Sequence, residues 1–357
     1  MTTNISLGNL SGFDDSTPSS DVTINMINLF YAVFLPCLSA MTIAGNLAII
    51  VAYYKVPGLR EKPSDLLILN LAVTDLLQGV TMSVFTTPLY ILGSWPYREF
   101  GCKVTVGLGD VTIVASLVTL GAISLDRMLL VSKEYPRYVK IQSRFRIKLT
   151  ICLCWIIAGI PMVVEIGLWE KAKEINLEAS LINFNYVCLS PPRRIRGFSF
   201  FMFIAFALLP VISVTVLSAI FFHRLKRRLK RHRRIDGVLS ISNSMSAATT
   251  AENSQQNISA AQRSNRRTKN RYIKPAVTLS ALVCAMAICM MPYCLYVIIG
   301  IVWPSCVMGA NPDILYGLIL LQISSSLLDP FLYAMTQSKI KNFYISKLRR
   351  FLKFGRA

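Results

Sequence analysis

Two aspartates lie inside long apolar segments, where an ionisable side chain is expensive to bury. Asp75 stands in the stretch Leu69–Leu77, and Asp329 stands in the stretch Ser324–Tyr333. Two such carboxylates with nearby hydroxyls could bind a small hard cation such as sodium, or they could share one proton, because adjacent carboxylates resist both ionising. The same groups could instead serve only hydrogen bonds between helices. The sodium ligands that we predict are Asp75, Ser116, Ser325 and Asp329.

A second group of residues could act in a conformational switch. Asp126 and Arg127 stand side by side where the third apolar segment ends, so they could pair in one conformation and separate in another. A pair that merely snorkels to the membrane boundary is the simpler interpretation of this dipeptide alone. Pro210, Pro292 and Pro330 lie inside later apolar segments. Proline kinks a helix and can provide a hinge, although it is also common in membrane helices.

Seven apolar segments hold these groups in place. Each runs for roughly 20 to 30 residues, which is enough to cross the ~30 Å hydrocarbon core of a membrane as a helix. Of the 357 residues, 54% are hydrophobic and only 16% are charged, whereas about a quarter are charged in a typical soluble domain. We therefore expect an all-α membrane protein, a bundle of seven transmembrane helices. The segments begin near Ile27, Ser64, Phe100, Lys148, Phe198, Tyr272 and Pro312.

The net charge of +20 could indicate nucleic-acid binding, but the distribution of the charge argues against that class. Basic residues gather in alternate loops and are densest in the run His223–Arg234, after the fifth segment. The positive-inside rule makes these loops cytoplasmic. Residues 1–25 contain no Lys or Arg. We therefore expect an extracellular N-terminus, a cytoplasmic C-terminus and no nucleic-acid partner.

The predicted organisation has three parts. Residues 1–26 form an extracellular tail that carries two glycosylation sequons, at Asn4 and Asn9. Residues 27–335 form the seven-helix bundle. Residues 336–357 form an amphipathic eighth helix and a short tail, because apolar and basic residues alternate there at helical spacing, as in a helix that lies on membrane lipids.

The third cytoplasmic loop, residues 225–270, differs from the other loops. Its centre, Ser240–Ser264, is rich in Ser, Asn, Ala, Thr and Gln and is expected to be disordered. Its basic flanks are expected to extend the fifth and sixth helices into the cytoplasm. These flanks could be a solvated charge run that sets the topology, or a docking surface for an intracellular partner beside anionic lipid.

Three of the nine cysteines fall on the predicted outer side, where oxidising conditions permit a disulfide. Cys102 opens the third segment and Cys188 lies midway between the fourth and fifth. We expect these two to pair and to tie the loop over the mouth of the bundle. Cys306 is then left as a free thiol or as an intermolecular partner.

Together these marks resemble a rhodopsin-like (class A) G-protein-coupled receptor over about residues 27–350. The resemblance implies a plasma-membrane protein that is not an enzyme. In that family an outside ligand favours an arrangement in which helix 6 swings outward, Arg127 is released, and a cleft opens for a heterotrimeric G protein. The implied switch residues are Asp126, Arg127, Pro292, Asp329, Pro330 and Tyr333. The matching marks are Gly45-Asn46, Asn70–Asp75, Trp95, Phe100–Cys102, Ser116, Ser124–Met128, Trp155, Pro161, Pro210, Cys289, Pro292 and Asp329–Tyr333.

The chain departs from the family pattern at several switch positions. Met128 replaces the tyrosine of the Asp-Arg-Tyr motif, and Met290 replaces the tryptophan of the Cys-Trp-x-Pro motif. Ser218 stands where helix 5 usually carries the tyrosine that meets Tyr333. The usual acid at the base of helix 6 is missing from Arg271-Tyr272. These changes favour altered switching, with constitutive signalling, weak signalling or a decoy receptor as the alternatives.

Asp110 resembles the aspartate that holds the ligand ammonium in biogenic-amine receptors. It stands eight residues after Cys102 rather than seven, and Gly109 has the usual place. One residue is about 100° of helical rotation, which can turn Asp110 toward the second or fourth helix. Asp110 is therefore either an amine contact or a buried acid paired with a polar neighbour, and Glu165 is a second possible cation partner. The predicted ligand-binding residues are Asp110, Met202, Phe203, Phe206, Tyr293 and Tyr296.

The ligand classes follow from this pocket, which is apolar apart from one acid. A biogenic amine is the first expectation, and a lipid-like molecule or a hydrophobic peptide end is the alternative. No lysine lies between Leu315 and Met335, which excludes a retinal Schiff base in the usual place, and no cofactor is expected. A transporter or channel is less expected, because it would require repeats or broken helices.

Overall fold

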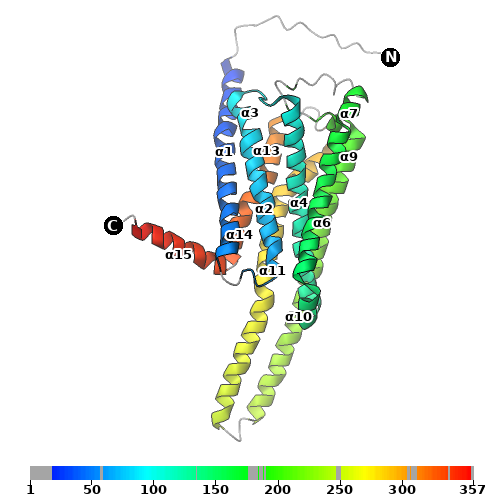
Figure 1. The fold of residues 1–357 in the computed structure, drawn as a ribbon. Helices are drawn as coiled ribbons and strands as arrows, with labels where there is room; N and C mark the ends of the chain where they lie inside the picture. Colours follow the sequence, from blue (N-terminus) through cyan, green and yellow to red (C-terminus); the bar gives the residue numbers. More distant parts are fainter. Residues whose placement is uncertain are drawn as a thin grey trace, which may run out of the picture.

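The computed structural model of the chain describes residues 18–56, 59–133, 135–175, 184, 188, 190–246, 251–303, 306, 312–336 and 338–354. Every element assigned within these ranges is a helix, and the helices stand side by side in one bundle (Figure 1). The elements are α1 (Pro18–Lys55), α2 (Asp65–Thr81), η1 (Met82–Thr86), α3 (Thr87–Leu92), α4 (Arg98–Ser132), α5 (Tyr135–Ile141), α6 (Arg144–Gly167), α7 (Trp169–Ile175), η2 (Pro192–Arg194), α9 (Arg196–Phe203), η3 (Ile204–Leu208), α10 (Leu209–Ser246), α11 (Ala251–Val302), α13 (Pro312–Ile323), α14 (Ser325–Thr336) and α15 (Ser338–Phe354).

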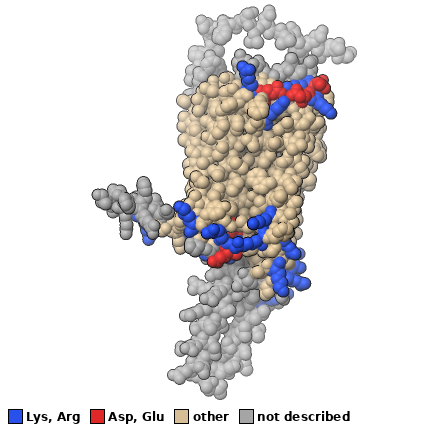
Figure 2. Space-filling model, viewed as in Figure 1, with Lys and Arg blue, Asp and Glu red and all other residues tan. Residues whose placement is uncertain are grey.

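Seven stretches of the described chain are helical, long and apolar enough to cross a membrane, which confirms the predicted seven-helix bundle. On the face drawn in Figure 2, charged side chains gather at the two ends and leave an uncharged belt between them. Such a belt is what the hydrocarbon core of a membrane requires. The stretches are Leu29–Lys55, Asp65–Leu92, Arg98–Ser132, Arg144–Gly167, Arg196–Arg231, Ala276–Gly300 and Gly317–Met335.

Two of the spans contain a π-helical turn just before a proline, which the sequence analysis did not predict. Ile204–Leu208 precedes Pro210 in the fifth span, and Met82–Thr86 precedes Pro88 in the second. A proline has no N–H and its ring crowds the carbonyl four residues earlier, and a widened turn relieves that crowding. In the second span, the carbonyl of Val84 accepts a hydrogen bond from the Tyr97 hydroxyl at 2.6 Å.

Asn70 on α2 joins its helix to two neighbouring spans inside the apolar core. The Asn70 amide on α2 donates to the Thr119 hydroxyl on α4 at 2.8 Å. The Trp155 indole on α6 donates to the Asn70 carbonyl oxygen at 2.9 Å. One asparagine thus fixes three spans relative to one another, since each partner satisfies one of its polar groups.

Helices α10 and α11 project far beyond the bundle at the end that also carries α15 (Figure 1). They contain 38 and 52 residues, or about 57 and about 78 Å at 1.5 Å per residue. Only residues 247–250 separate them. Of the segment expected to be disordered, Ser240–Ser264, residues 240–246 and 251–264 are helical, and residues 247–250 lie outside the described residues. No Gly or Pro interrupts residues 238–274, so nothing local stops either helix.

The predicted eighth helix is present as α15, which leaves the base of the bundle at a steep angle to the spans (Figure 1). Ile340 on its inner face is buried and packs into the core near Ile49 and Tyr53 on α1. This contact anchors α15 to the first span.

Candidate functional site

A disulfide marks one end of the bundle, called the disulfide end below. Cys102 at the start of α4 bonds to Cys188, with a sulfur–sulfur distance of 2.02 Å. This confirms the predicted pairing, which ties the segment between α7 and α9 to the third span. Cys306 is an exposed free thiol. The predicted glycosylation sites Asn4 and Asn9 lie outside the described residues.

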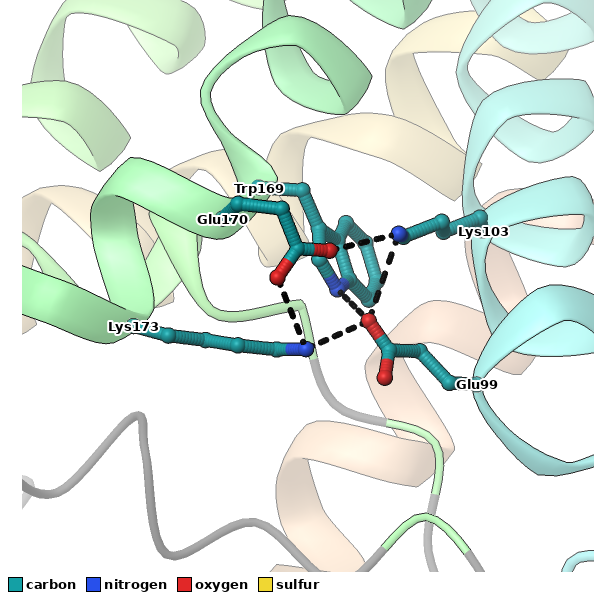
Figure 3. Close-up of polar contacts among 5 residues, drawn as sticks. All are labelled: Glu99, Lys103, Trp169, Glu170 and Lys173. Carbon is teal, nitrogen blue, oxygen red and sulfur yellow. Dashed lines mark hydrogen bonds and ion pairs between the residues drawn. The ribbon is translucent and has the colours of Figure 1, made fainter.

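A group of five residues, called the lid cluster, fastens α7 to the start of α4 (Figure 3). The buried Trp169 indole donates to Glu99 at 2.8 Å, and Lys173 pairs with Glu99 at 2.5 Å. Lys103 pairs with Glu170 at 2.9 Å and lies 5.4 Å from the centroid of the Trp169 ring. The hydrogen bond from Lys103 lowers the pKa of the Glu170 carboxyl. The charges of the two glutamates and the two lysines cancel, so the lid cluster has no net charge.

A second charged group, called the acid–arginine triad, lies between α4, α6 and η2. Arg193 Nη2 donates to Asp110 Oδ1 at 2.6 Å and to Glu165 Oε2 at 3.1 Å, while Arg193 Nε donates to Glu165 Oε1 at 2.8 Å. Two nitrogens of one guanidinium therefore hold both oxygens of Glu165 in a fork, the strong geometry for such a pair. Asp110 is thus a half-buried acid with a partner, turned toward the fourth span as its shifted spacing allowed.

The other predicted ligand residues do not gather around Asp110 equally. Phe206 packs against Val114 and Ala158, in a cluster between α4 and α6, and Phe203 is buried in the main core. Tyr293 on α11 lies within electrostatic range of both Asp110 and Arg193. Met202 and Tyr296 are half-buried, like Tyr293. Tyr293 is therefore the predicted ligand residue on α11 that shares the electrostatic surroundings of Asp110.

A cavity of about 40 Å³ lies in the middle of the bundle, above the roughly 10–15 Å³ that one water needs. Three of the four predicted sodium ligands line it, namely Ser116, Ser325 and Asp329. The fourth, Asp75, is fully buried and accepts a hydrogen bond from Ser116 at 3.4 Å, while its second oxygen has no hydrogen bond. The fold thus brings all four together.

Two more polar residues belong to this central cavity region, and the sequence analysis missed them. Ser326 donates to Gln78 at 3.0 Å, and Gln78 lines the cavity. Ser325 instead donates to the carbonyl of Gln322 in its own helix at 2.9 Å. Carboxylate, hydroxyl and amide oxygens are ligands that a hard cation prefers. The residues present therefore fit a small cation better than a soft metal.

At the opposite end, called the α15 end, Asp126 holds Arg127 and also binds α5. Arg127 Nη1 lies 3.2 Å from Asp126 Oδ2. The other carboxylate oxygen accepts from the Tyr138 hydroxyl at 2.9 Å and from the Gln142 amide at 2.7 Å. Burial and the charge of Asp126 raise the pKa of the Tyr138 phenol, so Tyr138 stays a hydrogen-bond donor at neutral pH. The sequence analysis missed both neutral partners.

Helix α10 is bound to α4 at the same end. The Ser124 and Ser218 hydroxyls are 3.3 Å apart, and Arg228 donates to the carbonyl of Val131 at 2.7 Å. The hydroxyl of Tyr333 is buried and has no hydrogen bond. Ser218, which the sequence singled out as the short replacement for a tyrosine, therefore pairs with α4.

Comparisons with known proteins agree with this geometry. The family model described as "7 transmembrane receptor (rhodopsin family)" matches residues 45–333. The alpha-1D adrenergic receptor of Homo sapiens is 24% identical over 89% of this chain and 56% of its own length. Melanopsin of Rattus norvegicus is 29% identical over 52% of this chain and 38% of its own length. The allatostatin-A receptor of Bombyx mori is 27% identical over 54% of this chain and 53% of its own length.

Among solved structures, squid rhodopsin has the same fold. Its TM-score is 0.67 at 17% sequence identity, covering 95% of this chain and 88% of that one. The chain spans between 38% and 56% of the length of the three relatives above. Their names cover an amine receptor, a peptide receptor and an opsin, so likeness alone does not select a ligand.

Proposed function

The chain belongs to the rhodopsin family of seven-transmembrane receptors, and we propose that it passes the signal of an extracellular ligand to a heterotrimeric G protein. It is a multi-pass plasma-membrane receptor and not an enzyme. The observation that carries the signalling proposal is the Asp126–Arg127 pair, held at 3.2 Å at the end that α10 and α11 extend. The pair lies at one end of α4, and the disulfide lies at the other end. A ligand would enter at the disulfide end.

The proposed orientation places the disulfide end outside the cell and the α15 end in the cytoplasm. A disulfide forms and persists on the oxidising side of the membrane. The basic residues of α10 and α15 lie at the other end, and the positive-inside rule assigns that end to the cytoplasm. The predicted glycans at Asn4 and Asn9 would then be extracellular.

In the proposed mechanism, Asp126 holds Arg127 in the resting state, and Tyr138 and Gln142 fix Asp126 from α5. A ligand that binds better to the open arrangement shifts the population toward it. Arg127 then leaves Asp126, the inner part of α11 moves away around Pro292, and a G protein enters the cleft. Tyr333, whose buried hydroxyl has no partner in the resting state, would gain one during this change.

For the ligand, the geometry supports a lipid-like or peptide molecule over a biogenic amine. An amine would need Asp110 as its counter-ion, and Arg193 already donates to that carboxylate at 2.6 Å. A neutral or apolar ligand end does not compete for this contact. Phe203, Met202, Tyr293 and Tyr296 would supply an apolar wall. A weakly signalling or decoy receptor is the alternative to which the departures at Ser218 and Met290 point.

An allosteric sodium ion is a further part of the proposal. Asp75, Ser116, Ser325 and Asp329 would hold it, since the central cavity has room for a water-sized ion and Ser116, Ser325 and Asp329 bring oxygen atoms to its otherwise mostly apolar lining. Such an ion would supply the positive charge that two buried carboxylates need. It would favour the resting state if the cavity contracts on activation.

Guanine-nucleotide exchange on purified G proteins, added to membranes that contain the chain, tests the proposed function. The wild type should raise exchange above empty membranes for at least one class of α subunit, with or without ligand. Arg127→Ala should remove most of that activity, because Arg127 is the group proposed to meet the G protein. Arg194→Ala, at an exposed arginine of the disulfide end, is the matched control and should signal normally. Exchange that survives Arg127→Ala would contradict the proposal.

A further inference from the structure

We propose that Arg193 is a built-in cation that occupies the two carboxylates, Asp110 and Glu165, to which an amine could otherwise bind, and thereby makes this receptor select against amine ligands. The inference rests on the proposed function as a ligand-operated receptor and deepens it, because it names the residue that decides the charge of the ligand. Asp110 and Glu165 are then positioning residues that hold Arg193, rather than contacts for an external ligand.

The hydrogen bonds of the triad already use what an ammonium ligand would need. Arg193 donates to one oxygen of Asp110 and to both oxygens of Glu165, at distances between 2.6 and 3.1 Å. A planar guanidinium matches a carboxylate with two parallel donors, whereas an ammonium offers a single point charge. A small amine, with all its donors on one nitrogen, therefore cannot reproduce the two-nitrogen fork that Arg193 makes with Glu165.

The exposed fractions of the three side chains also support a role for Arg193 in selecting against amines. The side chain of Glu165 is 1% exposed and that of Asp110 is 18% exposed, whereas that of Arg193 is 48% exposed. A molecule that approaches from the disulfide end thus meets the guanidinium first, and the carboxylates lie beneath it. The two carboxylates that would attract an amine are therefore already paired with Arg193, and their guanidinium partner is the more exposed group.

The backbone holds Arg193 in position. It lies in the short helix η2, after the consecutive prolines Pro191 and Pro192, five residues beyond the disulfide-bonded Cys188. The Ser199 hydroxyl donates to the Arg193 carbonyl at 2.6 Å. A tethered group faces its partner at an effective concentration on the order of millimolar or more, so a free amine competes at a disadvantage.

The charge of Arg193 persists at any physiological pH. Burial alone would lower the pKa of its guanidinium, but the charges of Asp110 and Glu165 outweigh burial and raise that pKa. Around the triad, the second oxygen of Asp110 accepts no hydrogen bond, and the Ser190 hydroxyl lies next to Glu165. These acceptors would be ready for another cation once the guanidinium is removed.

A gain of amine binding tests the inference. The receptor in lipid nanodiscs is titrated with 2-phenylethylamine and, separately, with 2-phenylethanol, which has the same carbon skeleton without the charge. Arg193→Ala should bind the amine at least tenfold more tightly than the wild type and should not gain affinity for the alcohol. Arg194→Ala, the neighbouring arginine outside the triad, should behave like the wild type. Adding Asp110→Asn and Glu165→Gln to Arg193→Ala should abolish the gain.

Two results would overturn the inference. One is a wild type that binds the amine as tightly as Arg193→Ala does. The other is an Arg193→Ala variant that gains no affinity. If two unpaired acids prevent that variant from folding, Arg193→Ala combined with Glu165→Gln keeps Asp110 as the one acid and should still bind the amine.

This readout does not involve a G protein, so the two proposals can fail separately. A chain that gains amine affinity on Arg193→Ala but never promotes nucleotide exchange would refute only the signalling function. A chain that signals but shows no gain would refute only the role of Arg193.

Discussion

At the disulfide end, Arg193 holds two acids through three hydrogen bonds, whereas at the α15 end Arg127 lies 3.2 Å from a single carboxylate oxygen that makes no hydrogen bond. The same residue type is therefore fastened in one place and loosely paired in the other. An arginine held by several hydrogen bonds resists rearrangement more than one held by a single contact, because more bonds must break together. The comparison indicates that the disulfide end is built to keep its shape and the α15 end to change.

The rest of the disulfide end agrees with this contrast. The lid cluster adds a buried tryptophan and four alternating charges to the covalent bond between Cys102 and Cys188. Buried polar atoms without a hydrogen bond occur in both regions, at Asp110 in the triad and at Asp126 and Tyr333 toward the other end. Such atoms carry a desolvation cost of about 1–3 kcal/mol each, which a second conformation can relieve.

The largest effect is expected from the disulfide. Cys102→Ala should destabilise the receptor by about 2–5 kcal/mol, because the loop that the bond closes becomes free in the unfolded chain. Receptor at the cell surface, counted by antibody on intact cells, should fall strongly. Cys306→Ala is the control, since that thiol is free, and it should have no such effect. A normal amount of the Cys102→Ala receptor at the cell surface would contradict the conclusion that the disulfide end is built to keep its shape.

The next largest effect is expected at the α15 end. Asp126→Asn removes the charge that holds Arg127, so basal nucleotide exchange should rise several-fold without ligand. Tyr138→Phe, which removes one neutral hydrogen bond to Asp126, should raise it less. If Asp126→Asn leaves basal exchange unchanged, the pair is not the resting lock.

The central cavity should give an intermediate effect that depends on salt. Asp75→Asn should reduce the sensitivity of agonist affinity to sodium chloride, measured against the same concentration of a large organic cation salt. The expected loss follows from removing one of two carboxylates proposed to hold the ion. Full sodium sensitivity in the variant would remove Asp75 from the proposed ion site.

A smaller effect is expected from one bond of the lid cluster. Trp169→Phe keeps the buried ring but loses the hydrogen bond to Glu99, which should cost about 1 kcal/mol of folding free energy. Thermal unfolding in nanodiscs measures this loss. Trp303→Phe, at an exposed tryptophan, serves as the control, and an equal loss there would mean that the bond to Glu99 contributes nothing.

The smallest effect is expected from acid. The pKa of Glu170 is lowered in the folded chain from its ordinary value of 4.5 by its bond to Lys103. Its stabilising contribution is therefore complete above about pH 4.5 and is lost as the pH falls through the lowered value. The acid-induced drop in melting temperature should be slightly smaller in Glu170→Gln. An identical drop in both would show that this surface pair is without consequence.

The pattern of apolar residues predicted the seven spans well, because the thickness of the membrane sets the length that each helix needs. Asp110 stands one residue later than the amine-binding aspartate of the family. From this shift the sequence analysis predicted that it could face the second or fourth helix, and it faces the fourth, since helical rotation is a local property. The polar composition of Ser240–Ser264 predicted disorder, whereas α10 and α11 extend over residues 240–246 and 251–264, because polar composition alone does not stop a helix that lacks Gly and Pro. The sequence carried only a weak indication that Arg193 has a special role. Arg193 and Arg194 form a basic pair in a loop that is expected to be extracellular, where the positive-inside rule predicts few basic residues.

The sequence by itself determined three local properties. These are the seven spans, the pairing of Cys102 with Cys188 on the predicted outer side, and the acids whose burial inside a span costs free energy. Only the tertiary structure decided which partner each acid has. Arg193 is 83 residues from Asp110 along the chain, and Ser326 is 248 from Gln78. The physical reason is that periodicity reports the environment of each helix face, whereas a contact between distant segments depends on how the helices are packed.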